Sequence, residues 1–91
     1  MLIDAAEAEK ALSSFDRWEV SKKEIQKLFL FPSFLEAIAF VNKVATKAEK
    51  AEHHPDIDIR YNKVKIVLST HSEGGITEKD IKLARIIDDL L

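Results

Sequence analysis

The spacing of the apolar residues changes at Pro55, and this change constrains the fold more than any other feature of the sequence. Between residues 33 and 51, apolar residues recur at helical spacing, which predicts an amphipathic helix ending near residue 51 or 52, before the proline. Beyond it, apolar and polar residues alternate over 57–61 and again over 64–68. An alternation of period two predicts strands with one buried face. This half of the chain is therefore expected to form a helix followed by a β-hairpin.

Capping residues mark the starts of three predicted helices. A Ser or Thr followed three residues later by an acidic residue predicts a capping box, in which each side chain binds the other residue's backbone amide. The pattern occurs as Ser33 with Glu36 and as Thr77 with Asp80. Asp4 supplies a third N-cap near the start of the chain. We expect one helix to begin after each of these caps.

Two shorter extended runs, residues 17–20 and 24–31, predict a first hairpin. The element order is then α-ββ-α-ββ-α, which predicts an α+β fold of two layers. It has a four-stranded antiparallel sheet with three helices on one face, and residues 1–91 form a single domain. The side chains of the first two helices expected to face the core are Ala5, Ala8, Leu12 and Phe15, followed by Phe34, Ala37, Ile38, Val41, Ala45 and Ala48.

Composition excludes several classes of function. With 14 Lys and Arg against 16 Asp and Glu, the net charge of −2 argues against a nucleic-acid surface, which needs clustered cations. The chain has no cysteine, no apolar run long enough to span a membrane and an acidic amino terminus unlike a secretory signal, so we expect a cytoplasmic protein. A domain of this size is of marginal stability, and a homodimer or homotetramer would cover its exposed sheet.

The histidines are the candidate chemical groups. His53 and His54 precede the first strand of the second hairpin, and His71 follows its second strand. Because the two strands run antiparallel, the start of one and the end of the other meet at the same end of the sheet. Imidazole titrates near neutral pH, so a cluster of three can donate and accept protons. The sequence therefore predicts an acid–base site at this end of the sheet.

Structural interpretations of the same residues stay open. Three separate surface histidines would need no common function, and a zinc site is a further alternative, although adjacent histidines rarely bind one ion together and no cysteine is available. Glu49 and Glu52 either orient an imidazole or belong to a solvated helix end. Trp18 either packs in the core or stacks on a planar ligand. Asp80 is expected to act in the cap and not in the chemistry.

The spacing of these residues resembles the signature of the pterin-4a-carbinolamine dehydratase family. The motif consists of Glu49-Lys-Ala-Glu52-His53-His54-Pro55, five residues, Tyr61, nine residues, His71, eight residues and Asp80. Flanking segments match as well, among them Leu68-Ser-Thr-His71 and Gly75-Ile-Thr-Glu-Lys-Asp80. The resemblance extends from Phe15 to the carboxyl terminus. The turn at residues 21–23 is tighter than in many members of the family.

The resemblance implies an enzyme that dehydrates 4a-hydroxytetrahydropterin to quinonoid dihydropterin and water, in support of tetrahydropterin recycling. It implies no metal and no redox cofactor, with a small pterin as substrate. By the same resemblance, His54 is the central binding and acid–base residue, while His53 and His71 donate protons to the two faces of the substrate. Loss of water needs an acid at the hydroxyl and a base at the proton on nitrogen, both of which imidazoles provide.

The resemblance also implies supporting residues around the histidines. Glu49 and Glu52 would orient the imidazoles, Pro55 belongs to the same motif, and Trp18 would form a wall of the pterin pocket. An alternative function is that of a non-catalytic binding or dimerisation partner of another protein, because some family members bind a transcription factor. The three histidines favour the enzyme, since an adaptor does not need converging imidazoles.

Overall fold

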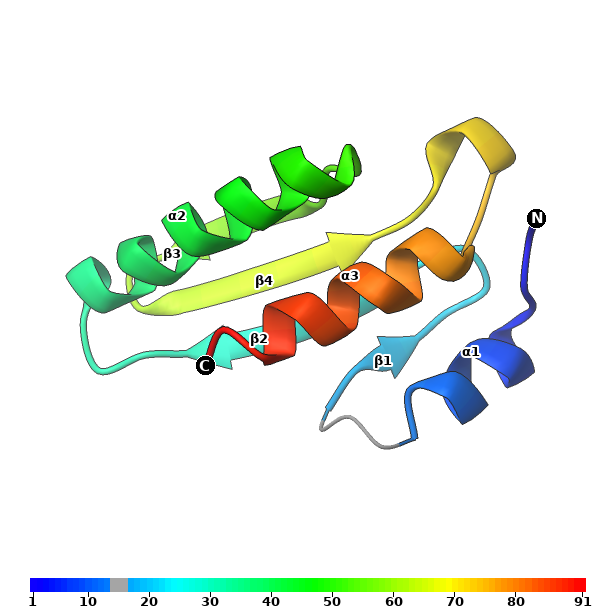
Figure 1. Ribbon diagram of the computed structural model, residues 1–91. Helices are drawn as coiled ribbons and strands as arrows, with labels where there is room; N and C mark the ends of the chain where they lie inside the picture. The colour runs from blue at the N-terminus through cyan, green and yellow to red at the C-terminus, as the bar shows by residue number, and fades with distance from the viewer. Residues whose placement is uncertain (14–16) are drawn as a thin grey trace.

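The computed structural model describes residues 1–13 and 17–91, and Figure 1 shows its arrangement. Its elements are α1 (Ala5–Ala11), β1 (Glu19–Val20), β2 (Ile25–Leu30), α2 (Phe34–Ala51), β3 (Asp56–Arg60), β4 (Lys63–Leu68), the 3₁₀ helix η1 (His71–Glu73) and α3 (Glu78–Asp88). Apart from η1, this is the predicted order α-ββ-α-ββ-α. Within the described ranges, no helix is long and apolar enough to cross a membrane.

The four strands form one antiparallel sheet in the order β1-β2-β4-β3. The two hairpins are joined through the central pair, in which Ile25 of β2 stands opposite Leu68 of β4. Helices α2 and α3 lie across one face of this sheet, and α1 packs beside β1 (Figure 1). The predicted two-layer α+β fold is confirmed.

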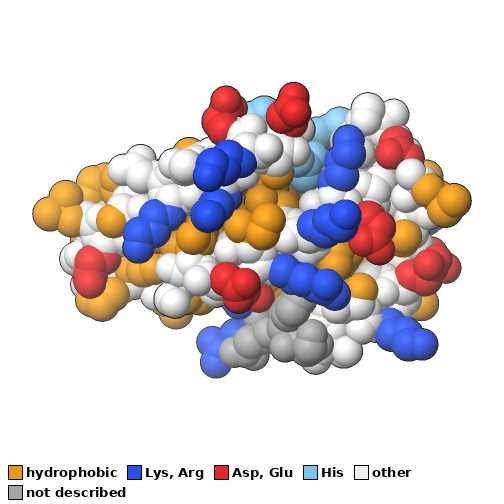
Figure 2. Space-filling view, viewed as in Figure 1, with side chains coloured by type: hydrophobic (Ala, Val, Ile, Leu, Met, Phe, Trp, Pro, Cys, Tyr) orange, Lys and Arg blue, Asp and Glu red, His pale blue; other side chains and the backbone are white. Residues whose placement is uncertain are grey.

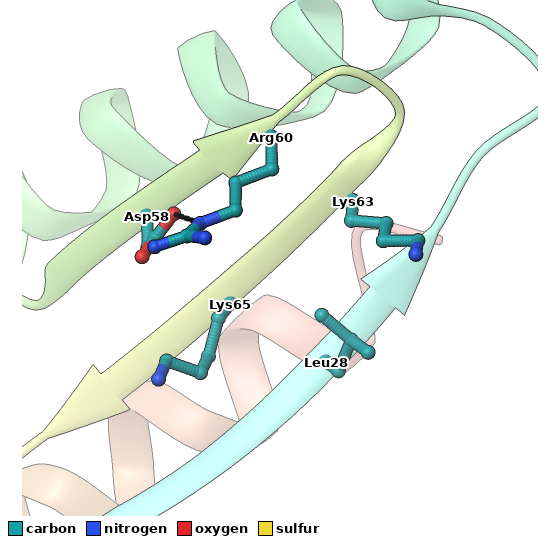
Figure 3. A pocket seen from close by; sticks show the side chains of 5 residues that line it. All are labelled: Leu28, Asp58, Arg60, Lys63 and Lys65. Atoms are coloured by element: carbon teal, nitrogen blue, oxygen red, sulfur yellow. Dashed lines mark hydrogen bonds and ion pairs between the residues drawn. The ribbon is translucent and has the colours of Figure 1, made fainter.

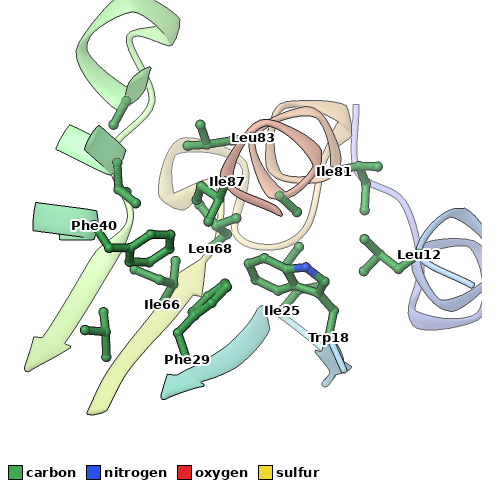
Figure 4. Close-up of a cluster of buried hydrophobic side chains, with 14 of the residues drawn as sticks. Leu12, Trp18, Ile25, Phe29, Phe40, Ile66, Leu68, Ile81, Leu83 and Ile87 are labelled. Carbon is green, nitrogen blue, oxygen red and sulfur yellow. The ribbon is translucent and has the colours of Figure 1, made fainter. Parts of the chain in front are cut away.

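The hydrophobic core fills the space between the sheet and the helices. Alternate residues of β4 are fully buried, which is the consequence of the period-two pattern in its sequence. Aromatic side chains close the middle of this layer, where the ring centroids of Phe29 and Phe40 lie 4.8 Å apart. Leu83 and Ile87 of α3 complete it (Figure 4). Packing of this kind fixes the ends of the strands, and thereby the residues that follow them.

The stripe predicted for α2 is partly wrong. Ala37 and Ala48 are buried as expected, but Phe40 and Val44 are buried as well, whereas Phe34 is 47% exposed and Ala45 is exposed. Apolar residues lie on two adjacent stripes of this helix, so their periodicity alone does not determine which stripe faces the sheet. Packing against the aromatic residues of β2 selects the stripe that contains Phe40.

The predicted caps are present, with one difference. Asp4 and Thr77 both form reciprocal capping boxes. Ser33 accepts a hydrogen bond from the Glu36 amide, but the Glu36 carboxylate accepts from the Ser33 hydroxyl and not from its amide. The second helix ends at residue 51 as predicted, followed by Glu52 in the left-handed conformation (φ 51°).

Two other predictions need correction, and a third falls on a residue outside the described ranges. The first strand is shorter than expected, because Arg17 has a positive φ of 66° that a strand does not accommodate. Tyr61 is not a packed strand residue: it lies in the β3–β4 turn with a φ of 53° and is 70% exposed. Phe15, predicted to face the core from the first helix, lies outside the described residues.

Candidate active site

The three histidines line one cavity of about 270 Å³ at the end of the sheet. Asp56 at the start of β3 pairs with Val67 near the end of β4, so the antiparallel register brings together the residues that precede β3 and follow β4. His53 and His54 come from the first segment and His71 from η1. Figure 2 shows histidine surface exposed on this part of the molecule. The structure thus brings together the residues that strand geometry predicted to meet.

His53 is held by a buried carboxylate. Its Nε2 lies 2.5 Å from Oδ1 of Asp80, and the two side chains are only 11% and 0% exposed. His53 follows the end of α2, where its backbone amide donates to the Ala48 carbonyl. Asp80 belongs to the first turn of α3. The contact therefore joins the end of one helix to the start of the other.

The Asp80 carboxylate is itself fixed by two other donors. Its Oδ2 accepts from the Thr77 amide and from the Thr70 hydroxyl, both at 2.9 Å. The two threonine hydroxyls are 2.7 Å apart. Since both of these groups donate to it, the carboxylate is suited to accept a third hydrogen bond, from Nε2–H of His53. This arrangement leaves Nδ1 of the His53 ring for a substrate.

His54 has a different environment from its neighbour. Its Nε2 lies 2.6 Å from Oε1 of Glu49, one of the carboxylates predicted to orient an imidazole, but the two side chains are 65% and 79% exposed. An exposed pair of this kind contributes little to stability because water screens it. Glu52, the other predicted carboxylate, lines the cavity without binding an imidazole.

His71 lies in the short helix η1 and is exposed. Gly74 ends this helix with a φ of 77°, a conformation that glycine adopts readily, and the Thr70 amide donates to the Gly75 carbonyl across the loop. Among residues 1–13 and 17–91, no group hydrogen-bonds the His71 imidazole. Both nitrogens of this ring are thus left for contact with a bound molecule.

Trp18 and Pro55 do not line the histidine cavity. The Trp18 side chain is 9% exposed, packs edge-on against Phe29, and donates from Nε1 to Oδ2 of Asp88 at 2.9 Å. Lys27, buried on the same face of the sheet, donates to the other oxygen of Asp88 at 2.8 Å. Of the two interpretations of the tryptophan, the structure supports packing in the core. The hydrogen bond to Asp88 holds the indole against the end of α3.

Sequence reasoning missed two members of the site. Asp80 was expected to act only in the helix cap; it does form the cap, but it also holds His53. Its place in the motif, separated from His71 by eight residues, was the available signal. Thr70 had no signal beyond its position next to His71, and only the folded chain shows that its hydroxyl binds the same carboxylate.

In the described part of the chain, no three His, Cys, Asp or Glu residues are grouped so as to hold a metal ion. A smaller hollow of about 150 Å³ lies on the sheet face that the helices leave uncovered, lined by Leu28, Asp58, Arg60, Lys63 and Lys65 (Figure 3). It contains no histidine, and its only polar contact among these residues joins Arg60 to Asp58. The acid–base groups therefore concentrate in the histidine cavity.

Comparison with known protein families shows to which family this chain belongs. The model of the family described as pterin 4 alpha carbinolamine dehydratase matches residues 1–90. The chain belongs to this family. A relative from Acidobacterium capsulatum, which carries the name pterin-4-alpha-carbinolamine dehydratase provisionally, is 54% identical over 83 residues, or 91% of this chain and 90% of the relative. A relative from Roseiflexus castenholzii with the same provisional name is 51% identical over 90 residues, covering 99% and 97%.

Solved structures of dehydratase-like proteins share the fold. A Brucella melitensis protein described as a transcriptional coactivator/pterin dehydratase superposes with a TM-score of 0.93 at 37% identity, over 99% of this chain and 98% of that one. A pterin dehydratase-like protein identified as a RuBisCO assembly factor in the alpha-carboxysome gives 0.71 at 25% identity, over 84% and 90%. Proteins with this pterin dehydratase fold are thus described with more than one function.

Proposed function

We propose that this protein dehydrates a 4a-hydroxytetrahydropterin to the quinonoid dihydropterin and water. The observation that carries the proposal is the meeting of His53, His54 and His71 in one cavity, with one of them held by a buried carboxylate. Membership of the pterin dehydratase family supports the substrate class.

The reaction needs only two proton transfers. In the carbinolamine, the hydroxyl-bearing carbon is bonded to a ring nitrogen that carries a proton. An acid protonates the hydroxyl, the carbon–oxygen bond breaks and water leaves. A base removes the proton from nitrogen, and the electrons of that N–H bond form the new carbon–nitrogen double bond. No covalent intermediate with the protein is required, and general acid–base catalysis of this kind contributes about 10²–10⁴-fold.

The environments of the histidines support different roles. His53 has the fixed orientation of a proton-transfer group, because Asp80 holds its Nε2 and leaves Nδ1 for the substrate. His71, which lines the same cavity from η1, is the second proton-transfer group. His54, which is exposed and paired with Glu49, is the central imidazole that both binds the substrate and takes part in proton transfer. Hydrophobic residues are scarce in this cavity, which suits a polar heterocycle.

Rapid-scan absorbance of the carbinolamine intermediate tests the proposal. Purified protein should accelerate its decay, and the His54→Ala variant should lose roughly 10²–10⁴-fold of that acceleration if the imidazole takes part in proton transfer. A loss below tenfold would restrict His54 to binding. Treatment with a chelator should change nothing, and chelator-sensitive turnover would indicate a metal-dependent reaction instead.

A second candidate function is binding to another protein. The uncovered face of the sheet exposes Leu28 and Leu30, 51% and 63%, beside the cations Lys63 and Lys65. Such a mixture fits a partner with an acidic and partly apolar surface. The same absorbance experiment separates the two functions, since wild-type protein without any dehydration activity would favour the binding role.

We also propose that the chain forms a homodimer or homotetramer. Strand β3 lies at an edge of the sheet, and the exposed leucines lie on its open face. An unpaired edge and an uncovered face both favour association. Light scattering coupled to gel filtration measures the mass directly. A mass of 10.3 kDa at micromolar concentration would contradict this proposal.

A further inference from the structure

The histidine cavity carries opposite charges on different walls. Glu52 enters it from the end of α2 and Lys79 from the first turn of α3, whereas His71 comes from η1. Figure 1 shows these three segments around the same end of the molecule. In Figure 2, histidine surface lies between acidic side chains on one side and a basic side chain on the other. The cavity is therefore electrically asymmetric.

No ion pair among the described residues neutralises the charge on Lys79. Its backbone amide donates to the Thr77 hydroxyl, which fixes the position of the residue at the start of α3. Its side chain is exposed, and within residues 1–13 and 17–91 no carboxylate forms an ion pair with its ammonium group. Glu52 lines the same cavity but does not pair with it. Each of the two charges therefore remains available to a ligand in the cavity.

A pterin has matching polarity. One edge of the bicycle presents an amino group and a ring N–H, both of which are donors suited to a carboxylate such as that of Glu52. The substituent that distinguishes one pterin from another is attached to the other ring, beside the nitrogen that takes part in the reaction. If the reacting carbon lies at the histidines and the donor edge at Glu52, Lys79 is the one charged lining residue left to contact this substituent.

We propose that Lys79 binds an anionic group on the substrate's side chain, so that the preferred substrate is a pterin carbinolamine with a phosphate or carboxylate on that chain. This inference rests on the proposed function and names its substrate class. The contact lies at an exposed position, so it is expected to change specificity by a modest factor and to weaken with added salt.

The test compares the value of kcat/KM for an anionic substrate with that for a neutral one. Three carbinolamines are needed: one with an uncharged side chain, one with a phosphate monoester and one with a carboxylate. Lys79→Ala should lower the anionic-to-neutral ratio about 3- to 10-fold, Lys79→Glu should lower it further, and salt should reduce the wild-type ratio. The anionic substrate whose kcat/KM falls more in the Lys79 variants identifies phosphate or carboxylate as the preferred group.

Lys82→Ala is the matched control, because Lys82 is exposed on the same helix but does not line the cavity. It should leave the ratio unchanged. A ratio that is insensitive to Lys79, or equally sensitive to Lys82, would overturn the inference while the dehydratase activity stands. If the wild-type protein turns over no carbinolamine, the proposed function fails. In that case, calorimetry measures the affinity of the protein for stable dihydropterins with a neutral or a phosphorylated side chain. Equal affinities for the two ligands would contradict the proposed role of Lys79.

Discussion

Nε2 of His53 lies 2.5 Å from Oδ1 of Asp80, although 27 positions separate the two residues. The contact connects the carboxyl end of α2 to the amino end of α3, and the aspartate is fully buried. One carboxylate therefore serves two purposes: it caps a helix and it orients an imidazole. This double use makes the effects of several substitutions predictable.

Replacing Asp80 by Asn should slow dehydration by about 10- to 100-fold, the usual effect of removing a group that orients a catalytic side chain. An amide no longer fixes the proton on Nε2 of His53, because it presents either its oxygen or its NH₂ group to the ring. The pH dependence of kcat should change as well. Single-turnover absorbance measured across a pH series checks both effects.

Asp89→Asn is the control for the charge change, because Asp89 is an exposed residue just after α3. It should alter neither kcat nor its pH profile. A purely structural role of Asp80 would lower the thermal stability of the Asn variant and leave the pH profile of the folded fraction unchanged.

The adjacent histidines should differ in their effect on stability. His53→Ala removes a partner from a buried carboxylate and should lower the free energy of unfolding by about 1–3 kcal/mol. His54→Ala truncates a side chain that is 65% exposed and should change it by less than about 0.5 kcal/mol. Urea denaturation, followed by the fluorescence of the single tryptophan, measures both. Equal losses for the two variants would contradict the assigned environments.

Trp18→Phe should affect stability more than catalysis. Phenylalanine keeps an aromatic ring in the core but cannot donate a hydrogen bond to Asp88. The loss of this bond to a carboxylate should lower the free energy of unfolding by about 1–2 kcal/mol. The KM for the carbinolamine should change less than threefold, since the indole does not line the histidine cavity. Circular dichroism gives the stability, and a tenfold rise in KM would place the tryptophan at the substrate after all.

Glu49→Gln should have a small effect on both the free energy of unfolding and the rate of dehydration. The pair with His54 is exposed on both sides, so the free energy of unfolding should change by less than about 0.5 kcal/mol. The glutamine still reaches the imidazole, and turnover should fall less than tenfold. Lys50→Gln, an exposed change in the same turn of α2, is the control for altered charge. A loss comparable to that of the Asp80 variant would show that Glu49 also orients a catalytic ring.

Local patterns carried most of the fold. Helix capping and the period-two alternation of β4 depend on residues that are close together in the chain, so both can be predicted from the sequence. The buried stripe of α2 could not be predicted in this way. Phe34 and Phe40 are equally apolar, and only the position of the sheet decides which of the two is buried. Tyr61 was misplaced for a similar reason, because its positive φ arises from the turn geometry.

The sequence by itself determined which histidines meet, since antiparallel strands return the chain to the same end of the sheet. Tertiary structure alone decided how they differ. It buried the carboxylate of Asp80 against His53, left His54 in solvent and set Lys79 on another wall of the cavity. Hydrogen bonding and burial depend on the packing of two helices against each other, and no spacing along the chain encodes their relative position.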